Sequence, residues 1–261
     1  MRHHERAIET YLARTASRHD VLGVLLTGSL ATRSERADSD VDLVLVVDED
    51  MWREAVAADR IMFVDREDVG YDGGYFDVKL ATVAQLEAAV DRADDPARHS
   101  LGSAEVLYDQ GFHLVDTVRR IAAHAGAEQA DLVASHVAQA RLHGEYFLAH
   151  GVEHDDPFLA AHAAVHLGLA AGRALLASTR TPYPGPKDLA ATLRALPDPG
   201  PRFAAAITEA ARTPSLRNGG ALLDLLEQHL GDALPAAATL SRFVLDNELA
   251  WFHGRTPPEH R

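Results

Sequence analysis

The sequence predicts an α+β protein: a mixed sheet with helices, followed by an all-helical bundle. Apolar runs typical of buried strands occur only in the first half, at 21–26, 41–47, 61–64, 75–80 and 105–108. Beyond residue 125, strand signals give way to alanine-rich helical patterns. We therefore predict two domains, 1–125 and 126–261, and the 261 residues are enough for both to bury a core.

Helices are predicted around these strands. Residues 3–18 have an amphipathic pattern, and Thr82 is a suitable N-cap for a helix over 83–91. A further helix is expected over 112–124, and a helix starting at Leu30 would follow the first strand. The first half is thus expected to alternate strands with helices.

The second half shows the spacing of packed helices. Apolar residues fall on single helix faces at Val133, Val137, Ala140 and Phe147, at Leu223, Leu226, Leu230 and Leu234, and at Leu240, Val244 and Trp251. Proline-rich turns are expected at 181–188 and 196–201, and the segment 154–157 reads as a turn with an N-cap. We expect Trp251 and Phe252 to belong to the core.

Composition excludes several classes of protein. There is no cysteine, which rules out disulfides, thiolate metal sites and cysteine nucleophiles. The formal net charge of −14 argues against bulk nucleic acid as a partner and is compatible with a cationic small molecule. No apolar run reaches the length of a membrane span and no secretory signal is present, so we expect a cytoplasmic monomer or homodimer.

Three aspartates point to a metal site. Asp40 comes just before the second predicted strand, and Asp42 lies near its start. One residue separates them, so in an extended chain both side chains point to the same face. Close carboxylates repel unless a cation lies between them, and Mg²⁺ favours carboxylates together with phosphate oxygens. Asp77, on a later strand, is available as a third carboxylate, and Gly28-Ser29 ends the first strand where a phosphate could approach the backbone.

For Asp40 and Asp42 taken alone, the alternative to a metal site is that both are solvated acidic residues flanking a strand. The combination is much rarer: a strand, Gly28-Ser29, then Ser39-Asp40-Val41-Asp42, a strand, and finally Phe76-Asp77-Val78. These motifs resemble the signature of the nucleotidyltransferase fold of the DNA polymerase β superfamily. The chain is similar to bacterial aminoglycoside and lincosamide nucleotidyltransferases, which also carry a helical domain. The motif resemblance covers about residues 20–82.

The resemblance implies the following roles. Asp40, Asp42 and Asp77 would be catalytic and would bind Mg²⁺, expected as two ions, with ATP or another nucleoside triphosphate as substrate. Gly28, Ser29 and Ser39 would contact the nucleotide, and Asp77 would complete the metal site or act as general base. The family often has glycine where this chain has Arg33, which would reshape the phosphate loop or place a cation near the triphosphate. Lys187, after a proline-rich turn, would reach the nucleotide phosphates, and a solvated lysine is the equal alternative.

Other polar residues have simpler explanations. Glu105 is an alternative general base, or an edge-strand carboxylate. His162 and His166 have zinc-like spacing, but no third ligand is evident, so a packing or acceptor-pocket role is favoured. The acidic run 48–50 is expected to be solvated.

The leading hypothesis is transfer of a nucleoside monophosphate, AMP from ATP, to a hydroxyl of a small molecule such as an aminoglycoside-type antibiotic. The same chemistry on a biosynthetic intermediate or a protein is an alternative. A non-catalytic antitoxin or regulatory module is another, although such a module would be expected to lack one of the three carboxylates.

Overall fold

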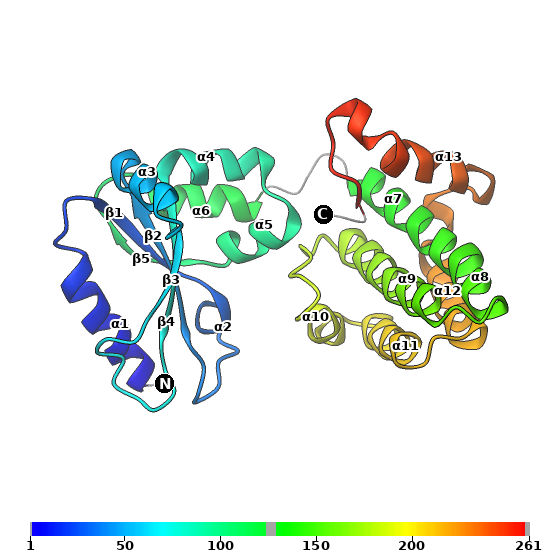
Figure 1. Ribbon diagram of the computed structural model, residues 1–261, viewed down its shortest axis with the longest axis horizontal. Helices are drawn as coiled ribbons and strands as arrows, with labels where there is room; N and C mark the ends of the chain where they lie inside the picture. The colour runs from blue at the N-terminus through cyan, green and yellow to red at the C-terminus, as the bar shows by residue number, and fades with distance from the viewer. Residues whose placement is uncertain (1, 124–128, 259–261) are drawn as a thin grey trace. The chain divides into compact units, whose positions relative to one another are not determined.

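The computed structural model describes residues 2–123 and 129–258, and the chain divides into two compact units, Met1–His124 and Ala125–Arg261. The first unit is a five-stranded mixed sheet with helices, and the second is all-helical (Figure 1), so the predicted α+β class is confirmed. The predicted domain boundary at residues 125 and 126 lies outside the described residues.

The sheet has the strand order β3-β4-β2-β1-β5. Its strands are β1 (Val21–Leu26), β2 (Val41–Val47), β3 (Met62–Asp65), β4 (Phe76–Thr82) and β5 (Glu105–Asp109). The central strands β2 and β4 are parallel, and the other neighbouring pairs are antiparallel. β1 and β2 are almost entirely apolar because both of their faces are covered by helices, as is usual for central strands.

Helices cover both faces of this sheet. They are α1 (Arg2–Thr15), α2 (Gly28–Ala31), α3 (Glu49–Ala57), α4 (Val83–Arg92), α5 (Asp95–Gly102) and α6 (Leu114–Ala123). One core lies under α1 and α3, and the opposite core lies under α4, α5 and α6. The predicted Thr82 cap is confirmed: its hydroxyl accepts from the Gln85 backbone N–H, and the Gln85 side chain accepts from the Thr82 backbone N–H in return.

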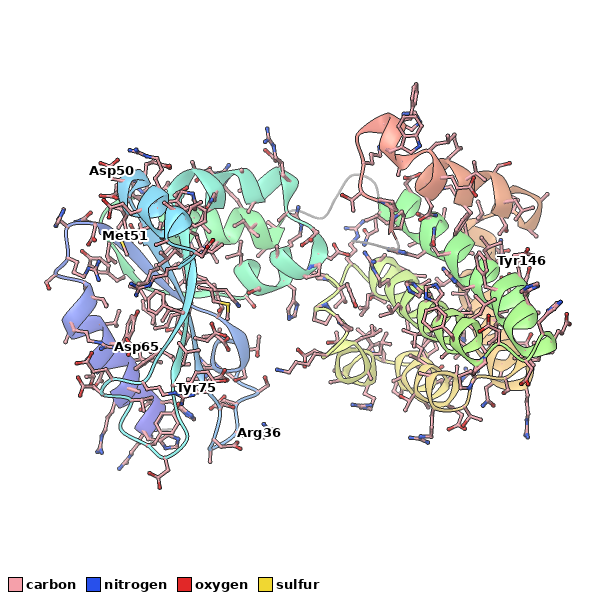
Figure 2. All side chains as sticks on the ribbon, in the orientation of Figure 1. Arg36, Asp50, Met51, Asp65, Tyr75 and Tyr146 are labelled. Carbon is pink, nitrogen blue, oxygen red and sulfur yellow. The ribbon has the colours of Figure 1, made fainter. Side chains whose placement is uncertain are left out.

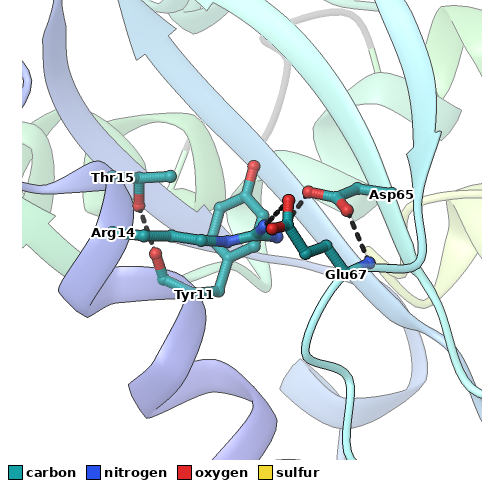
Figure 3. Close-up of polar contacts among 5 residues, drawn as sticks. All are labelled: Tyr11, Arg14, Thr15, Asp65 and Glu67. Carbon is teal, nitrogen blue, oxygen red and sulfur yellow. Dashed lines mark hydrogen bonds and ion pairs between the residues drawn. The ribbon is translucent and has the colours of Figure 1, made fainter.

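A polar contact fastens α1 to the segment around the end of β3. Arg14 forms ion pairs with Asp65 and with Glu67, the latter at 3.1 Å, and Asp65 also accepts from the backbone N–H of Glu67 (Figure 3). The buried Tyr11 packs its ring against Phe76 at the start of β4, with a centroid distance of 4.7 Å. Burial, and the nearby charge of Asp65, raise the pKa of Tyr11 to about 12. Helix α1 therefore supports the strand that carries Asp77.

The second unit is built around the long helix α9. Its elements are α7 (Gln129–Arg141), a π-helical turn (Leu142–Phe147), α8 (Leu148–Glu153), α9 (Pro157–Ser178), α10 (Leu189–Ala195), α11 (Gly200–Arg212), α12 (Leu216–Leu230), α13 (Thr239–Phe243) and a second π-helical turn (Val244–Glu248), with three short 3₁₀ turns (Gly231–Ala233, Ala236–Ala238 and Ala250–His253). α7, α8, α11 and α12 all contact α9, and small residues on α9 allow this close packing. α9 is long and apolar enough to span a membrane, but 61% of its apolar window is buried, as in the core helix of a bundle.

Several expectations are corrected. Trp251 and Phe252 are 75% and 70% exposed instead of belonging to the core, because the last helical stretch breaks into short turns and does not present one continuous stripe. The helix expected from Leu30 begins at Gly28 and has only four residues. The acidic run 48–50 starts helix α3: Glu49 and Asp50 are exposed, as expected, and the Asp48 carboxylate accepts a hydrogen bond from the Met51 backbone N–H at 2.8 Å. The predicted end of the 112–124 helix, His124, lies outside the described residues.

Candidate functional site

The three predicted aspartates come together. Asp40, Asp42 and Asp77 each offer a carboxylate oxygen, and these oxygens lie within 4.8 Å of one another. All three side chains are partly buried. Within residues 2–123 and 129–258, no other group of three or more His, Asp or Glu side chains brings its ligand atoms this close.

The parallel pairing of β2 and β4 creates this cluster. Asp42 lies directly opposite Asp77 in the register, and the backbone N–H of Val41 donates to the carbonyl of Tyr75 at 3.0 Å. Asp40 is the residue immediately before β2, so it lies just outside the strand, at the end where β2 begins. The alternation of side chains along an extended chain turns Asp40 and Asp42 to the same side, while Val41 is fully buried.

The cluster has the chemistry of a site for a hard divalent cation. Asp77 Oδ1 is buried and has no hydrogen-bond partner in the protein. A buried carboxylate oxygen without a partner is costly, and three carboxylates at this separation repel one another. A cation such as Mg²⁺ would remove both costs because it takes carboxylate oxygens as ligands. The residues present therefore fit a magnesium ion.

Gly28 allows Asp42 to reach the cluster. The residue has φ +66°, a left-handed conformation, and a Cβ placed on it would lie 2.0 Å from Asp42 Oδ2. The backbone N–H of the preceding residue, Thr27, donates a hydrogen bond to the Asp42 carbonyl at 2.9 Å. The end of β1 is thus pressed directly against the side chain and the backbone of Asp42.

Replacing Gly28 with alanine is expected to weaken divalent-cation binding as well as stability. The left-handed backbone alone should cost roughly 1–3 kcal/mol, and the added methyl group must also displace the Asp42 carboxylate. Gly73→Ala is the matched control, because Gly73 has φ +77° and open space around its Cβ position. Titration with Mn²⁺ and thermal unfolding check the prediction, and equal cation affinity in both variants would contradict it.

The predicted nucleotide-binding residues of the first unit lie near this cluster along the chain. Ser29 belongs to the short helix α2, directly after Gly28. The Ser39 hydroxyl accepts from the Arg36 backbone N–H at 2.9 Å, and the Ser39 carbonyl accepts from the Tyr71 hydroxyl at 2.7 Å. Arg33 is exposed and has φ +56°, a left-handed backbone conformation that is more usual for glycine.

Tyr75 is a site residue that the sequence reasoning missed. The nearby carboxylate of Asp40 raises the pKa of Tyr75, with smaller contributions from burial and from the charges of Asp77 and Asp42. Tyr75 and Asp77 are two positions apart on one extended segment, so the two-residue period was the available signal. Figure 2 shows Tyr75 at the end of the sheet where β4 begins, in the same unit as Arg36.

Two other predicted residues are not part of the acidic cluster. Glu105 is exposed on the edge strand β5, where it pairs with Leu26 at the end of β1. Lys187 belongs to the helical unit, where it is exposed in the turn before α10 and does not begin that helix. The cap of α10 is Asp188. These placements leave the proposed contacts of both side chains as predictions.

His162 and His166 have a neighbour that the sequence did not reveal. The ring of His143, from the π-helical turn, stacks on His166 with a centroid distance of 5.0 Å and lies 5.9 Å from His162. Both ring nitrogens of His143 are buried without a hydrogen-bond partner. Burial lowers the pKa of His143 to about 3, and His166 and His162 add to the effect.

A small cavity adjoins these histidines. Its volume is about 50 Å³, and its polar lining includes His136, Gln139, His143, His166, Arg173 and Tyr183. The predicted packing or acceptor-pocket role of the histidine pair stays a prediction beside this cavity. Among the described residues, the ring nitrogens of the three histidines do not form a cluster close enough for a metal ion. Arg173 donates to the carbonyl of Pro258 at 2.9 Å and lies over the Tyr183 ring.

Comparisons with known proteins give little beyond this geometry. No protein-family model and no curated protein matches the chain. Among solved structures, the chain is similar to a nucleotidyltransferase-like protein from Exiguobacterium sibiricum, with 13% identity and a TM-score of 0.44 over 94% of this chain and 80% of that one. Similarity of this degree assigns no activity, substrate or cofactor to the present chain.

Proposed function

We propose that the protein is a Mg²⁺-dependent nucleotidyltransferase that moves a nucleoside monophosphate, AMP from ATP, to a hydroxyl group of a small molecule. The observation that carries the proposal is the convergence of Asp40, Asp42 and Asp77 beside the Gly28 turn. The spacing of these residues in the sequence, and a sheet followed by helices, support the same proposal.

In the proposed reaction, the acceptor oxygen bonds to the α-phosphorus while the bond from that phosphorus to the β-phosphate oxygen breaks, releasing pyrophosphate. Asp40 and Asp42 would hold magnesium, which supplies charge neutralisation on the phosphates. Asp77, with its unpartnered Oδ1, would complete the ligand set or accept the proton of the acceptor hydroxyl. Gly28 and Ser29 would bring backbone N–H groups to the phosphates, with Ser39 and Arg33 on the adjoining loop.

We assign Lys187 to the nucleotide phosphates and leave acceptor recognition mainly to the helical unit. The net charge of −14 supports a cationic acceptor such as an aminoglycoside-type antibiotic. Lys187 is exposed, so it is accessible to a polyanionic ligand.

The test is direct. The protein is incubated with Mg²⁺, each ribonucleoside triphosphate and a panel of hydroxylated compounds that includes aminoglycosides, and products are sought by mass spectrometry. The proposal expects an acceptor carrying one added nucleoside monophosphate, and an equal amount of pyrophosphate. Modification of an added protein in place of a small molecule would redirect the acceptor class. Absence of any product, with cation binding unaffected by loss of Asp42, would favour a non-catalytic module.

A further inference from the structure

Two packed helices of the second unit carry polar side chains on the faces that line its cavity. His136, Gln139 and His143 recur at the spacing of one helix face along α7 and the π-helical turn. On α9, His166 and Arg173 lie seven positions apart, which places them on one face as well. The inward faces of packed helices are normally apolar, so this polar lining departs from the core around it.

Gln139 and His143 bring unused hydrogen-bonding capacity to the cavity. The two residues are 3% and 2% exposed, and all four of their side-chain polar atoms are buried without a hydrogen-bond partner in the protein. A buried carboxamide or imidazole in this state is costly, which is why most such groups in folded proteins have a partner. Both residues therefore offer donors and acceptors to whatever occupies the cavity.

The cavity has room for more than one water molecule. A single water needs roughly 10–15 Å³ of such space, so the cavity of about 50 Å³ accommodates a chemical group of several non-hydrogen atoms. Alanine and leucine fill most of the surrounding core and would close the space with no unsatisfied atoms. Buried residues that lower stability in this way are typical of binding sites.

The charge of the lining favours an anion. Arg173 is 8% exposed and contributes a permanent positive charge to the cavity wall, while no Asp or Glu is found among the described residues that line it. The pKa of His143 is about 3, so its ring is neutral at pH 7 and offers one donor and one acceptor. A cation would be repelled by Arg173, and an apolar molecule would leave the polar atoms of Gln139 and His143 unsatisfied.

We propose that this cavity is a binding site for a small oxyanion, a phosphate or carboxylate group, which accepts hydrogen bonds from Gln139 and His143 beside the positive charge of Arg173. The acceptor atoms of Gln139 and His143 suit a hydroxyl on the same ligand, as in hydrogen phosphate or a hydroxy acid. All lining residues belong to the helical unit, and the inference does not depend on the proposed nucleotidyl transfer.

The test compares Gln139→Met with Gln228→Met. Methionine keeps the length of the side chain and removes both polar atoms, and Gln228 is an exposed glutamine of α12 in the same unit. Binding of inorganic phosphate and of acetate is measured by calorimetry on the full chain at constant ionic strength, with EDTA present so that no divalent cation takes part. Thermal unfolding midpoints are recorded with and without each anion.

We expect at least one of the two anions to bind the unmodified protein and to raise its unfolding midpoint. Gln139→Met should weaken this binding by about tenfold or more, as for loss of a hydrogen bond to a charged group, and Gln228→Met by less than about twofold. Without anion, Gln139→Met should unfold at the same temperature or higher, because it removes two unsatisfied buried atoms. A purely structural role for Gln139 predicts a lower midpoint.

The pattern of binding also identifies the ligand. Binding of phosphate alone assigns the site to phosphate groups, binding of acetate alone assigns it to carboxylates, and either result supports the inference when Gln139→Met weakens it. Anion binding should persist in Asp42→Asn, whose substitution lies in the other unit. Loss of binding in that variant would place the anion at the acidic cluster and overturn the inference.

Two further results would overturn it. If neither anion binds the unmodified protein, water is the occupant of the cavity. If Gln139→Met and Gln228→Met weaken binding equally, the anion binds elsewhere. Should Gln139→Met fail to fold, Gln139→Glu takes its place, since it keeps the size of the side chain and adds a negative charge that repels an anion at pH 8. Anion binding at full strength in Gln139→Glu would then refute the site.

Discussion

Asp42→Asn is expected to abolish detectable nucleotidyl transfer and to remove high-affinity binding of Mg²⁺ or Mn²⁺ at the cluster. The amide keeps the shape of the side chain but loses the negative charge that a hard cation requires. Because a direct ligand is lost, the fall in turnover should exceed the roughly 100-fold effect of losing an outer hydrogen-bond partner. Rate measurements at saturating ATP and Mn²⁺ titration are the checks.

The same substitution should leave the fold intact. Three carboxylates whose oxygens lie within 4.8 Å repel one another without a cation, so removal of one charge should keep or raise the unfolding midpoint in the absence of metal. The rise in midpoint that Mg²⁺ produces should disappear. Asp38→Asn is the control, since Asp38 is 73% exposed, pairs with Arg36 and lies outside the cluster. Turnover that survives in Asp42→Asn would refute the site.

His143→Leu is expected to remove a large part of the acid sensitivity of the helical unit. The pKa of His143 is about 3 in the folded protein and about 6.5 in an unfolded chain. Below pH 6.5 the unfolded state therefore binds a proton that the folded state refuses. The stability associated with neutral His143 is complete above that pH and is lost as the pH falls toward 3, by about 1.4 kcal/mol per unit.

Between about pH 7.5 and about pH 5 this residue should account for about 2 kcal/mol of lost stability. Leucine cannot be protonated and leaves no buried nitrogen without a partner, so His143→Leu should match or exceed the original stability at neutral pH. Urea unfolding followed by circular dichroism at both pH values measures the difference. His150→Leu is the control, because His150 is an exposed histidine of the same unit. An unchanged pH slope in His143→Leu would contradict the prediction.

Local sequence signals were sufficient for the sheet and for the acidic cluster. The strands 21–26 and 41–47 are almost entirely apolar runs, and their observed bounds coincide with the predicted ones. The convergence of Asp42 with Asp77 needed only one further assumption, that their strands pair side by side, and the parallel register satisfies it. Period, polarity and motif spacing are short-range properties, which is why they could be read without the structure.

Contacts between distant segments could not be read in this way. Nothing near Tyr71 indicates that its hydroxyl meets the Ser39 carbonyl, because the approach depends on how the loop before β4 folds back. Likewise, the burial of His143 against His166 depends on the packing of two helices. The exposure of Trp251 follows from a break in a helical stretch whose apolar spacing looked continuous. Tertiary packing decided each of these cases.

The parallel pairing of β2 with β4 also determines where the chain can change length. The loop between β3 and β4 lies outside the ladder, so residues inserted there can be taken up without moving Asp77. One residue inserted within β4, ahead of Asp77, would instead turn that side chain to the opposite face of the sheet. Natural variation in this part of the chain is therefore expected to accumulate as loop length, while the spacing from Tyr75 to Asp77 stays fixed.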